Sequence, residues 1–433
     1  MSRTPASITA VILTALCAVL PFVFHTGPGS FTLPRAVLLQ TGAAAAALIL
    51  LLSNRRARFP AFPFLCAWIA VLALSAAFSP FPLSGIRTLI LFASCAALAY
   101  CAAAAFHEEK PLAALCVTIV CAGSVMALHG IVQSHAPVLS ALNPLRGRFT
   151  IIATAGSPAM LGGWLAPGLC LAFVLSLRAR SLTARALLRA SFAAMALALF
   201  LCMSRSGWLA AAGGLLVTLV CLSASRAARL RNAAAGLAVC LVLALALAGA
   251  REAASRTILK YTQAPPAAAV LAQAAGPGSK SDSIRLRLFL LRAARDMIAR
   301  RPVLGHGPDG FRMQYPETQA GLIKDPDTRA RYAALVTNRV ATHAHNEFAE
   351  AAVEGGAAGF AAFALLLIAG MRGVRRRVHN GERESETILV CGVAGALAAM
   401  LIQSGLEFTL HLPLIAALFW ILFGAGCAQA PEV

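Results

Sequence analysis

Residues 156–177 read GSPAMLGGWLAPGLCLAFVLSL, a stretch of 22 residues without a charged side chain. The hydrocarbon core of a bilayer is about 30 Å thick, and an α-helix of about 20 apolar residues crosses it. This stretch therefore predicts a membrane-spanning helix.

Apolar runs of similar length recur along the chain. Hydrophobic residues make up 59% of the sequence and charged residues 12%, a composition that excludes an ordinary soluble domain. The polar residues SRSG at 204–207 divide the longest apolar stretch into two runs. The sequence thus predicts an all-α polytopic membrane protein of about twelve helices, at 7–24, 36–53, 61–78, 85–106, 111–133, 156–177, 187–203, 206–224, 233–250, 347–370, 387–408 and 411–427.

The positive charges predict the orientation of these helices. With a cytoplasmic N-terminus, the inner segments carry seventeen Lys and Arg residues and the short outer segments carry five. Both termini are then cytoplasmic. Helices 1–9 fall within residues 1–250, one long outer loop spans 251–346, and helices 10–12 fall within 347–433.

The remaining composition excludes several classes of function. The net charge of +20 reflects this arginine distribution, so no nucleic-acid partner is expected. All twelve cysteines fall inside predicted helices, and no CxxC spacing is present, so neither disulfides nor a cysteine metal site is expected. Without a P-loop or a GxGxxG strand-to-helix fingerprint, we expect no nucleotide and no cofactor.

The outer loop contains one clear amphipathic helix, SIRLRLFLLRAARDMIARRP at 283–302. On its helical wheel Arg287 falls within the apolar face, formed by Ile284, Leu288, Leu291, Ala294 and Ile298. The opposite polar face consists of Arg285, Arg292, Asp296 and Arg300. The helix can lie on the membrane with its arginines at lipid phosphates. Arg287, by contrast, points toward the membrane domain and needs a buried phosphate or carboxylate there.

Arg205 poses a similar question in CMSRSGW at 202–208. It interrupts two apolar runs at the predicted outer boundary, where an arginine can extend to lipid headgroups. The adjacent serines and Gly207 favour a tight polar turn that presents Arg205 to a ligand. Both interpretations remain open at this point.

The stretch ATHAHNEFAE at 341–350 is unusually polar for the mouth of a membrane helix. Asn346 or Thr342 can cap that helix, whose dipole disfavours protonation of an imidazole just before it. His345 is therefore a candidate general base, the alternative being a surface histidine. His343 and His345 could also bind zinc as a pair, but a third ligand at helical spacing is missing.

Acidic residues continue along the same predicted helix. Glu347, Glu350 and Glu354 form one stripe, which either faces a wet cavity or forms a salt bridge with Arg205 or another outer arginine. Asp325 and Asp327 could hold a metal ion, although an Asp-Pro pair is also an ordinary turn. Metal binding is the less favoured interpretation there.

Three candidates from distant parts of the chain share the outer side: Arg205, Arg287 and His345. Two cations and a neutral base facing one compartment suit a reaction with an anionic leaving group and a hydroxyl nucleophile.

Two segments resemble the O-antigen ligase and polymerase superfamily. They are RLRLFLLRAARDMIARRPVLGHGPDGF at 285–311 and HAHNEFAEAAVEGGAAGF at 343–360, and SRSGW at 204–208 matches in kind. An aromatic residue expected near Leu291 is missing, and AGSPAM at 155–160 keeps only the proline of an Asn-Pro-Asn segment. These two departures weaken the assignment to a particular branch more than the resemblance to the superfamily as a whole.

The resemblance implies glycan transfer from an undecaprenyl diphosphate donor to a hydroxyl of lipid A core, without a metal and with inversion. It implies a location in the bacterial inner membrane, among membrane lipids, with the long loop and the active site in the periplasm. His345 is the implied catalytic residue. The predicted substrate-binding residues are Arg205, Arg287, His343, Asn346 and Glu354.

Alternative functions differ in acceptor or in class. Within the superfamily, a repeat-unit acceptor makes a polymerase and a protein serine makes a protein O-oligosaccharyltransferase. A polysaccharide or lipid transporter would place its distinctive charges near the bilayer midplane rather than outside. A receptor whose basic loop binds anionic polysaccharide would need no base.

Overall fold

The computed structural model describes residues 5–25, 31–53, 57–135, 151–223, 280–336, 340–381 and 383–429. Within these ranges the chain is helical and forms no β-strand, apart from one isolated bridge between Arg58 and Gln429. Eleven of the twelve predicted apolar runs are helices, and the run at 233–250 lies outside the described residues. They are α1 (Pro5–Val19), α2 (Leu33–Leu52), α3 (Phe62–Ala77), α4 (Ile86–Ala105), α5 (Glu109–His135), α6 (Pro158–Arg178), α7 (Leu182–Leu201), α8 (Arg205–Leu222), α14 (Glu347–Asn380), α15 (Glu384–Ser404) and α16 (Pro413–Cys427).

The length and composition of these helices fit a polytopic membrane protein. Among the described residues, nine helices are long and apolar enough to span a membrane, while α3 and α16 are shorter apolar helices of 16 and 15 residues. The predicted division at 204–207 is confirmed, because α7 ends at Leu201 and α8 begins at Arg205.

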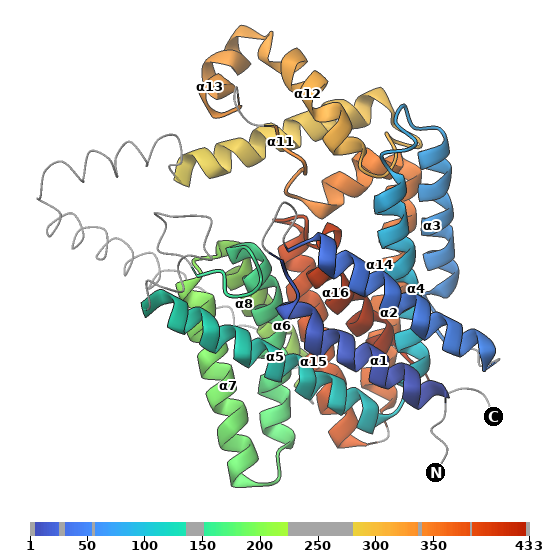
Figure 1. Ribbon diagram of the computed structural model, residues 1–433, viewed down its shortest axis with the longest axis vertical. Helices are drawn as coiled ribbons and strands as arrows, with labels where there is room; N and C mark the ends of the chain where they lie inside the picture. The colour runs from blue at the N-terminus through green and yellow to red at the C-terminus, as the bar shows by residue number, and fades with distance from the viewer. Residues whose placement is uncertain are drawn as a thin grey trace, which may run out of the picture.

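Small residues bring the helices of the bundle close together. A Cβ on Gly207 of α8 would lie 3.1 Å from the Cα of Gly162 on α6. A Cβ on Gly214 would lie 2.6 Å from the carbonyl oxygen of Gly395 on α15. Such contacts are typical of helix packing in membranes, where close backbone approach increases van der Waals contact. At the centre, every residue of α16 is buried (Figure 1).

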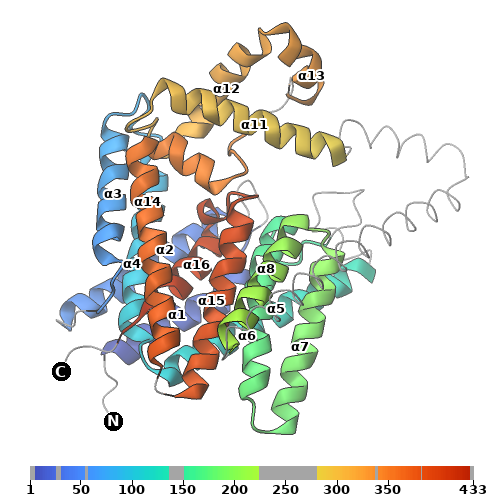
Figure 2. The same cartoon turned by 180° about the vertical axis from the view of Figure 1, so that it is seen from behind.

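A second layer covers one end of this bundle. It consists of α11 (Lys280–Arg300), α12 (Gly310–Ile323) and α13 (Pro326–Val336), and the view from behind shows it extending beyond the bundle helices (Figure 2). The layer has its own apolar core, separate from that of the bundle, formed by Phe289, Leu290, Ala293, Ala294, Met297, Phe311, Tyr315, Leu335, Val336, Ala344 and Val353. The described part of the predicted outer loop therefore folds into three helices.

The predicted apolar face of α11 is wrong in part. Ala294 is buried as expected, but Ile284, Leu288 and Leu291 are exposed, and the helix instead buries Phe289, Leu290, Ala293 and Met297. Helix α11 itself carries apolar side chains on several of its sides. A helical wheel alone therefore does not show which side packs against the rest of the layer.

Gly356 interrupts helix α14 with φ 61° and ψ −161°. The loop at 302–307 runs across the kink, and its backbone forms hydrogen bonds with the backbone of α14 on both sides of Gly356. The amide N–H of Ala357 donates to the carbonyl of Pro302 (2.8 Å), and that of Gly307 donates to the carbonyl of Glu354 (2.9 Å). A Cβ on Gly356 would lie 2.4 Å from the Val303 carbonyl, so glycine is required here. The crossing fixes the second layer onto the start of α14.

Candidate active site

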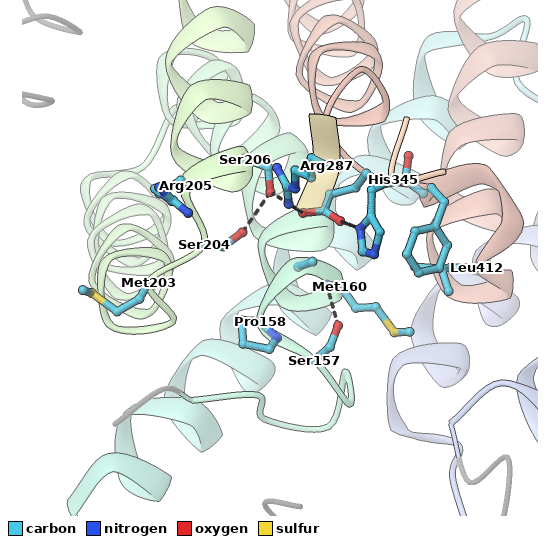
Figure 3. A pocket seen from close by; sticks show the side chains of 14 residues that line it. Ser157, Pro158, Met160, Met203, Ser204, Arg205, Ser206, Arg287, His345 and Leu412 are labelled. Atoms are coloured by element: carbon cyan, nitrogen blue, oxygen red, sulfur yellow. Dashed lines mark hydrogen bonds and ion pairs between the residues drawn. The ribbon is translucent and has the colours of Figure 1, made fainter. Parts of the chain in front are cut away.

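A cavity of about 410 Å³ lies beneath α11, at the end of the bundle that the second layer covers. Its walls come from the start of α6, the turn between α7 and α8, α11, the segment before α14 and the connection between α15 and α16. Arg205, Arg287 and His345 all line it (Figure 3). The structure thus brings together the three residues that the sequence placed on one side of the membrane.

Glu407 is the residue that joins two of them. Its carboxylate is buried, and Oε1 accepts a hydrogen bond from Nη2 of Arg287 at 2.5 Å while Oε2 lies 3.0 Å from Nδ1 of His345. Ser206 Oγ also donates to Oε1, at 3.4 Å. This carboxylate is the anionic partner that Arg287 requires on the face toward the membrane domain.

The contact with Glu407 determines how His345 can act. Because a carboxylate only accepts hydrogen bonds, the neutral imidazole carries its proton on Nδ1 and keeps a lone pair on Nε2. The backbone of His345 is left-handed, with φ 53°, a conformation that few non-glycine residues adopt. Nε2 of His345 is then free to accept a proton inside the cavity.

Asn346 fixes the segment that carries His345. Its Oδ1 accepts a hydrogen bond from the N–H of Ala349 (2.9 Å), which confirms the predicted cap of α14. Its Nδ2 donates to the carbonyl of Gly405 (2.8 Å), two residues before Glu407. Asn346 thereby ties the histidine segment directly to the segment that carries its carboxylate partner.

Arg205 begins α8 on the other side of the cavity. Ser204 caps the helix by accepting a hydrogen bond from the N–H of Gly207 (3.2 Å), so the predicted polar turn is confirmed. The side chain of Arg205 is exposed, and within the described part of the chain it has no ion-pair partner. Its guanidinium is therefore available to an anion in the cavity.

The sequence profile of a protein family described as O-Antigen ligase matches residues 190–364, which include Arg205, Arg287 and His345. This match supports the resemblance to the O-antigen ligase superfamily. Members of the matched family are glycosyltransferase-like enzymes that act on lipid-linked glycans. No curated protein matches the sequence.

Besides Asn346, two of the residues predicted to bind substrate do not line the cavity: His343 and Glu354. Nδ1 of His343 contacts Oε1 of Glu350 at 2.6 Å, and its ring stacks on Phe408 at 4.0 Å. Glu354 accepts a hydrogen bond from the N–H of Asp309 at 2.6 Å. Both residues lie behind the cavity wall.

The described residues give the metal sites considered from the sequence no support. His343 and His345 contact different carboxylates, Phe408 packs against both rings, and the pair is not part of the group of possible metal ligands found among the described residues. Asp325 caps α13 by accepting hydrogen bonds from Thr328, and these contacts lower the pKa of its carboxyl. The helix cap and the lowered pKa are both those of an ordinary turn residue.

The acidic stripe also differs from its expected ion pairs. Instead of an outer arginine, Glu347 pairs with His411 (2.8 Å) and Glu350 pairs with His343. Glu350, Glu354 and His411 form the one group of three or more possible metal ligands among the described residues.

Sequence reasoning missed Glu407 and His411. Glu407 was assigned to the helix at 387–408, but α15 ends at Ser404 and leaves it in the connection to α16. The string GLEFTLHL at 405–412 carries a carboxylate and an imidazole between two apolar runs, and this interruption was the available signal.

The wall opposite His345 is held by a buried arginine. Arg35 of α2 is 1% exposed and donates hydrogen bonds to the carbonyl oxygens of Ala155 (2.8 Å), Val23 (3.0 Å) and Pro21 (3.1 Å). This arginine was expected in a short outer segment. Because it fixes the chain just before Ser157, where the cavity wall begins, its role is structural.

Proposed function

We propose that this protein is an O-antigen ligase that transfers a glycan from undecaprenyl diphosphate to a sugar hydroxyl of lipid A core. The observation that carries the proposal is the cavity in which Glu407 joins Arg287 to His345 and which Arg205 also lines. A general base and two guanidinium groups in one cavity are what direct displacement of a diphosphate requires.

The geometry supports the following reaction. Nε2 of His345 accepts the proton of the acceptor hydroxyl as its oxygen attacks the anomeric carbon of the donor sugar. The bond from that carbon to the diphosphate breaks, and the diphosphate departs with the electron pair. Glu407 stabilises the imidazolium that forms, as a carboxylate does beside a catalytic histidine. Direct displacement inverts the anomeric configuration.

The arginines bind the departing diphosphate. A guanidinium has five N–H donors, so Arg287 keeps donors for phosphate oxygens while one of them contacts Glu407. Each charge-assisted hydrogen bond stabilises the developing anion by roughly 1.5–3 kcal/mol. We infer that these two cations take the place of a divalent metal ion. Asn346 contributes by positioning His345.

Reconstitution tests the reaction and its acceptor together. The protein in nanodiscs is supplied with an undecaprenyl diphosphate-linked glycan, EDTA and one acceptor at a time: lipid A core, a repeat unit or a peptide. We expect extension of lipid A core that EDTA does not inhibit. Extension of another acceptor alone would make the protein a polymerase or a protein glycosyltransferase. Transfer that stops in EDTA and returns with magnesium would contradict the role given to the arginines.

Orientation can be tested by labelling in intact cells. We propose that the second layer faces the periplasm and that the end of α14 faces the cytoplasm. In a background with the exposed Cys66 and Cys121 replaced by alanine, a cysteine at the exposed Ala320 should react with an impermeant thiol reagent in spheroplasts. A cysteine at the exposed Asn380 is the matched control and should react only after lysis. The reverse pattern would overturn the orientation.

A further inference from the structure

A second group of titratable side chains lies behind the cavity, and we name it the acid–histidine cluster. Its carboxylates come from the first two turns of α14, before the kink at Gly356, and each is at most 3% exposed. One histidine precedes α14 and the other ends the short 3-10 helix η3 (Thr409–His411). The members are His343, Glu347, Glu350, Glu354 and His411.

His411 meets carboxylate oxygens at both ring nitrogens. Nδ1 lies 2.8 Å from Oε1 of Glu347, and Nε2 lies 3.4 Å from Oε2 of Glu354. Oε1 of Glu350 is 3.9 Å from Nε2. A neutral imidazole has a single N–H, so its other nitrogen would direct a lone pair at a carboxylate. With the carboxylates ionised, His411 carries a proton on both nitrogens, and Nδ1 makes an ion-pair contact with Glu347 rather than a hydrogen bond.

This imidazolium offsets a concentration of buried negative charge. Within the described residues, no lysine or arginine lies within ion-pair distance of the three carboxylates. Their second oxygens accept hydrogen bonds from the backbone N–H groups of Leu410, Ala344 and Asp309. Burying several carboxylates is costly unless a cation and hydrogen-bond donors compensate them. His411 supplies the cation from a different segment.

The same two segments present the catalytic pair on the other side of the wall. His345 precedes α14, and Glu407 lies four residues before His411. Phe408 fills the space between the two sites, with its ring 4.0 Å from that of His343 and 5.0 Å from that of His345. A shift of η3 relative to α14 would therefore change the contact between His345 and Glu407.

We propose, on the basis of the function proposed above, that His411 is a positioning residue. As a protonated histidine, it fastens η3 to the first turns of α14 and so keeps Glu407 in hydrogen-bond range of His345. It does not line the cavity that holds His345.

The charges around His411 set the pH dependence of this role. Burial lowers its pKa, but Glu347, Glu350 and Glu354 outweigh that effect and raise the pKa well above 6.5. His343 lies beside it at a ring distance of 5.5 Å, and α4 contributes the ring of Phe92 and, near Glu347, the thiol of Cys95. Since the folded pKa is the higher one, the stabilisation is complete below the unfolded value and is lost as pH rises through the folded value.

Three variants test the proposal in nanodiscs: His411→Gln, His411→Lys and the double variant His411→Gln/Glu354→Gln. His411→Gln removes the positive charge, and His411→Lys keeps a positive charge at this position. The double variant removes the positive charge together with one of the negative charges that it offsets. Single-turnover transfer, donor binding and thermal unfolding at several pH values are measured for each. His379→Gln is the control, because His379 is exposed near the far end of α14.

We expect His411→Gln to slow single-turnover transfer by about 100-fold, the scale of a 1 Å misplacement, while donor binding changes little. His411→Lys and the double variant should recover part of the loss, and only the proteins that keep His411, the wild type and the His379→Gln control, should lose stability as pH rises above 7. If His411→Gln cannot be isolated folded, recovery of folding by either other variant supports the same conclusion.

The proposal is wrong if His411→Gln transfers like the wild type and the control, or if neither other variant recovers folding or transfer. Donor binding and transfer that fall together in every variant would also contradict it. A wild type that binds donor but transfers to no acceptor would instead refute the proposed function, and the unfolding measurements would still test the charge on His411.

Discussion

His345→Ala should reduce single-turnover transfer by about 100- to 10,000-fold, the range that a general base contributes, while donor binding stays nearly intact. The reason is that proton acceptance by Nε2 matters only when the acceptor hydroxyl attacks, whereas the donor is bound through its diphosphate. The measurements are donor affinity and single-turnover transfer in nanodiscs at saturating acceptor.

His343 supplies the matched comparison for this prediction. It lies two residues before His345 but contacts Glu350 instead of Glu407 and does not line the cavity. His343→Ala should therefore reduce the transfer rate per folded molecule less than His345→Ala does. If His343→Ala proves the more damaging change, the base has been assigned to the wrong histidine.

Glu407→Gln tests the tautomer of the base. The carboxylate accepts the Nδ1 proton, whereas a glutamine amide can donate to Nδ1 and so place the imidazole proton on Nε2. We expect transfer to fall as it does in other histidine enzymes whose orienting carboxylate becomes an amide, by up to about 10,000-fold. Transfer at the wild-type rate would show that Glu407 does not orient His345.

The sequence predicted the membrane helices well, because the length of an apolar run is visible along the chain. It also predicted that Arg205, Arg287 and His345 share one side of the membrane, since the charges of the loops determine orientation. Their common cavity follows from contacts between distant segments. The backbone crossing of 302–307 with Gly356, for example, depends on hydrogen bonds that no local pattern specifies.

The residues that were missed or misassigned share a physical cause. Glu407 and His411 stand beside apolar runs, where hydropathy alone extends a helix past its true end at Ser404. The buried side of α11 was assigned wrongly because Leu288 and Leu290 are equally apolar, although one is exposed and the other buried. Hydropathy measures preference for an apolar environment but does not distinguish a protein core from other apolar surroundings.

Arg287→Ala should weaken donor binding and transfer together, by about 10- to 150-fold for the loss of one charge-assisted contact. The guanidinium meets the diphosphate before and during its departure, so both quantities depend on it. The variant also leaves Glu407 buried without its cation, which lowers stability further. Arg205→Ala should show the same pattern without the stability loss.

Arg287→Lys and Arg285→Ala separate this role from general charge. Lysine keeps the charge but cannot form a two-pronged contact with a phosphate and hold Glu407 as well, so it should recover little. Arg285 lies two residues earlier on α11, where its guanidinium donates to the backbone carbonyl of Arg331 instead of entering the cavity. Its replacement by alanine should therefore change donor binding much less than the loss of Arg287. If Arg285→Ala proves the more damaging change, the diphosphate binds on the opposite side of α11, and the catalytic cavity assigned here is wrong.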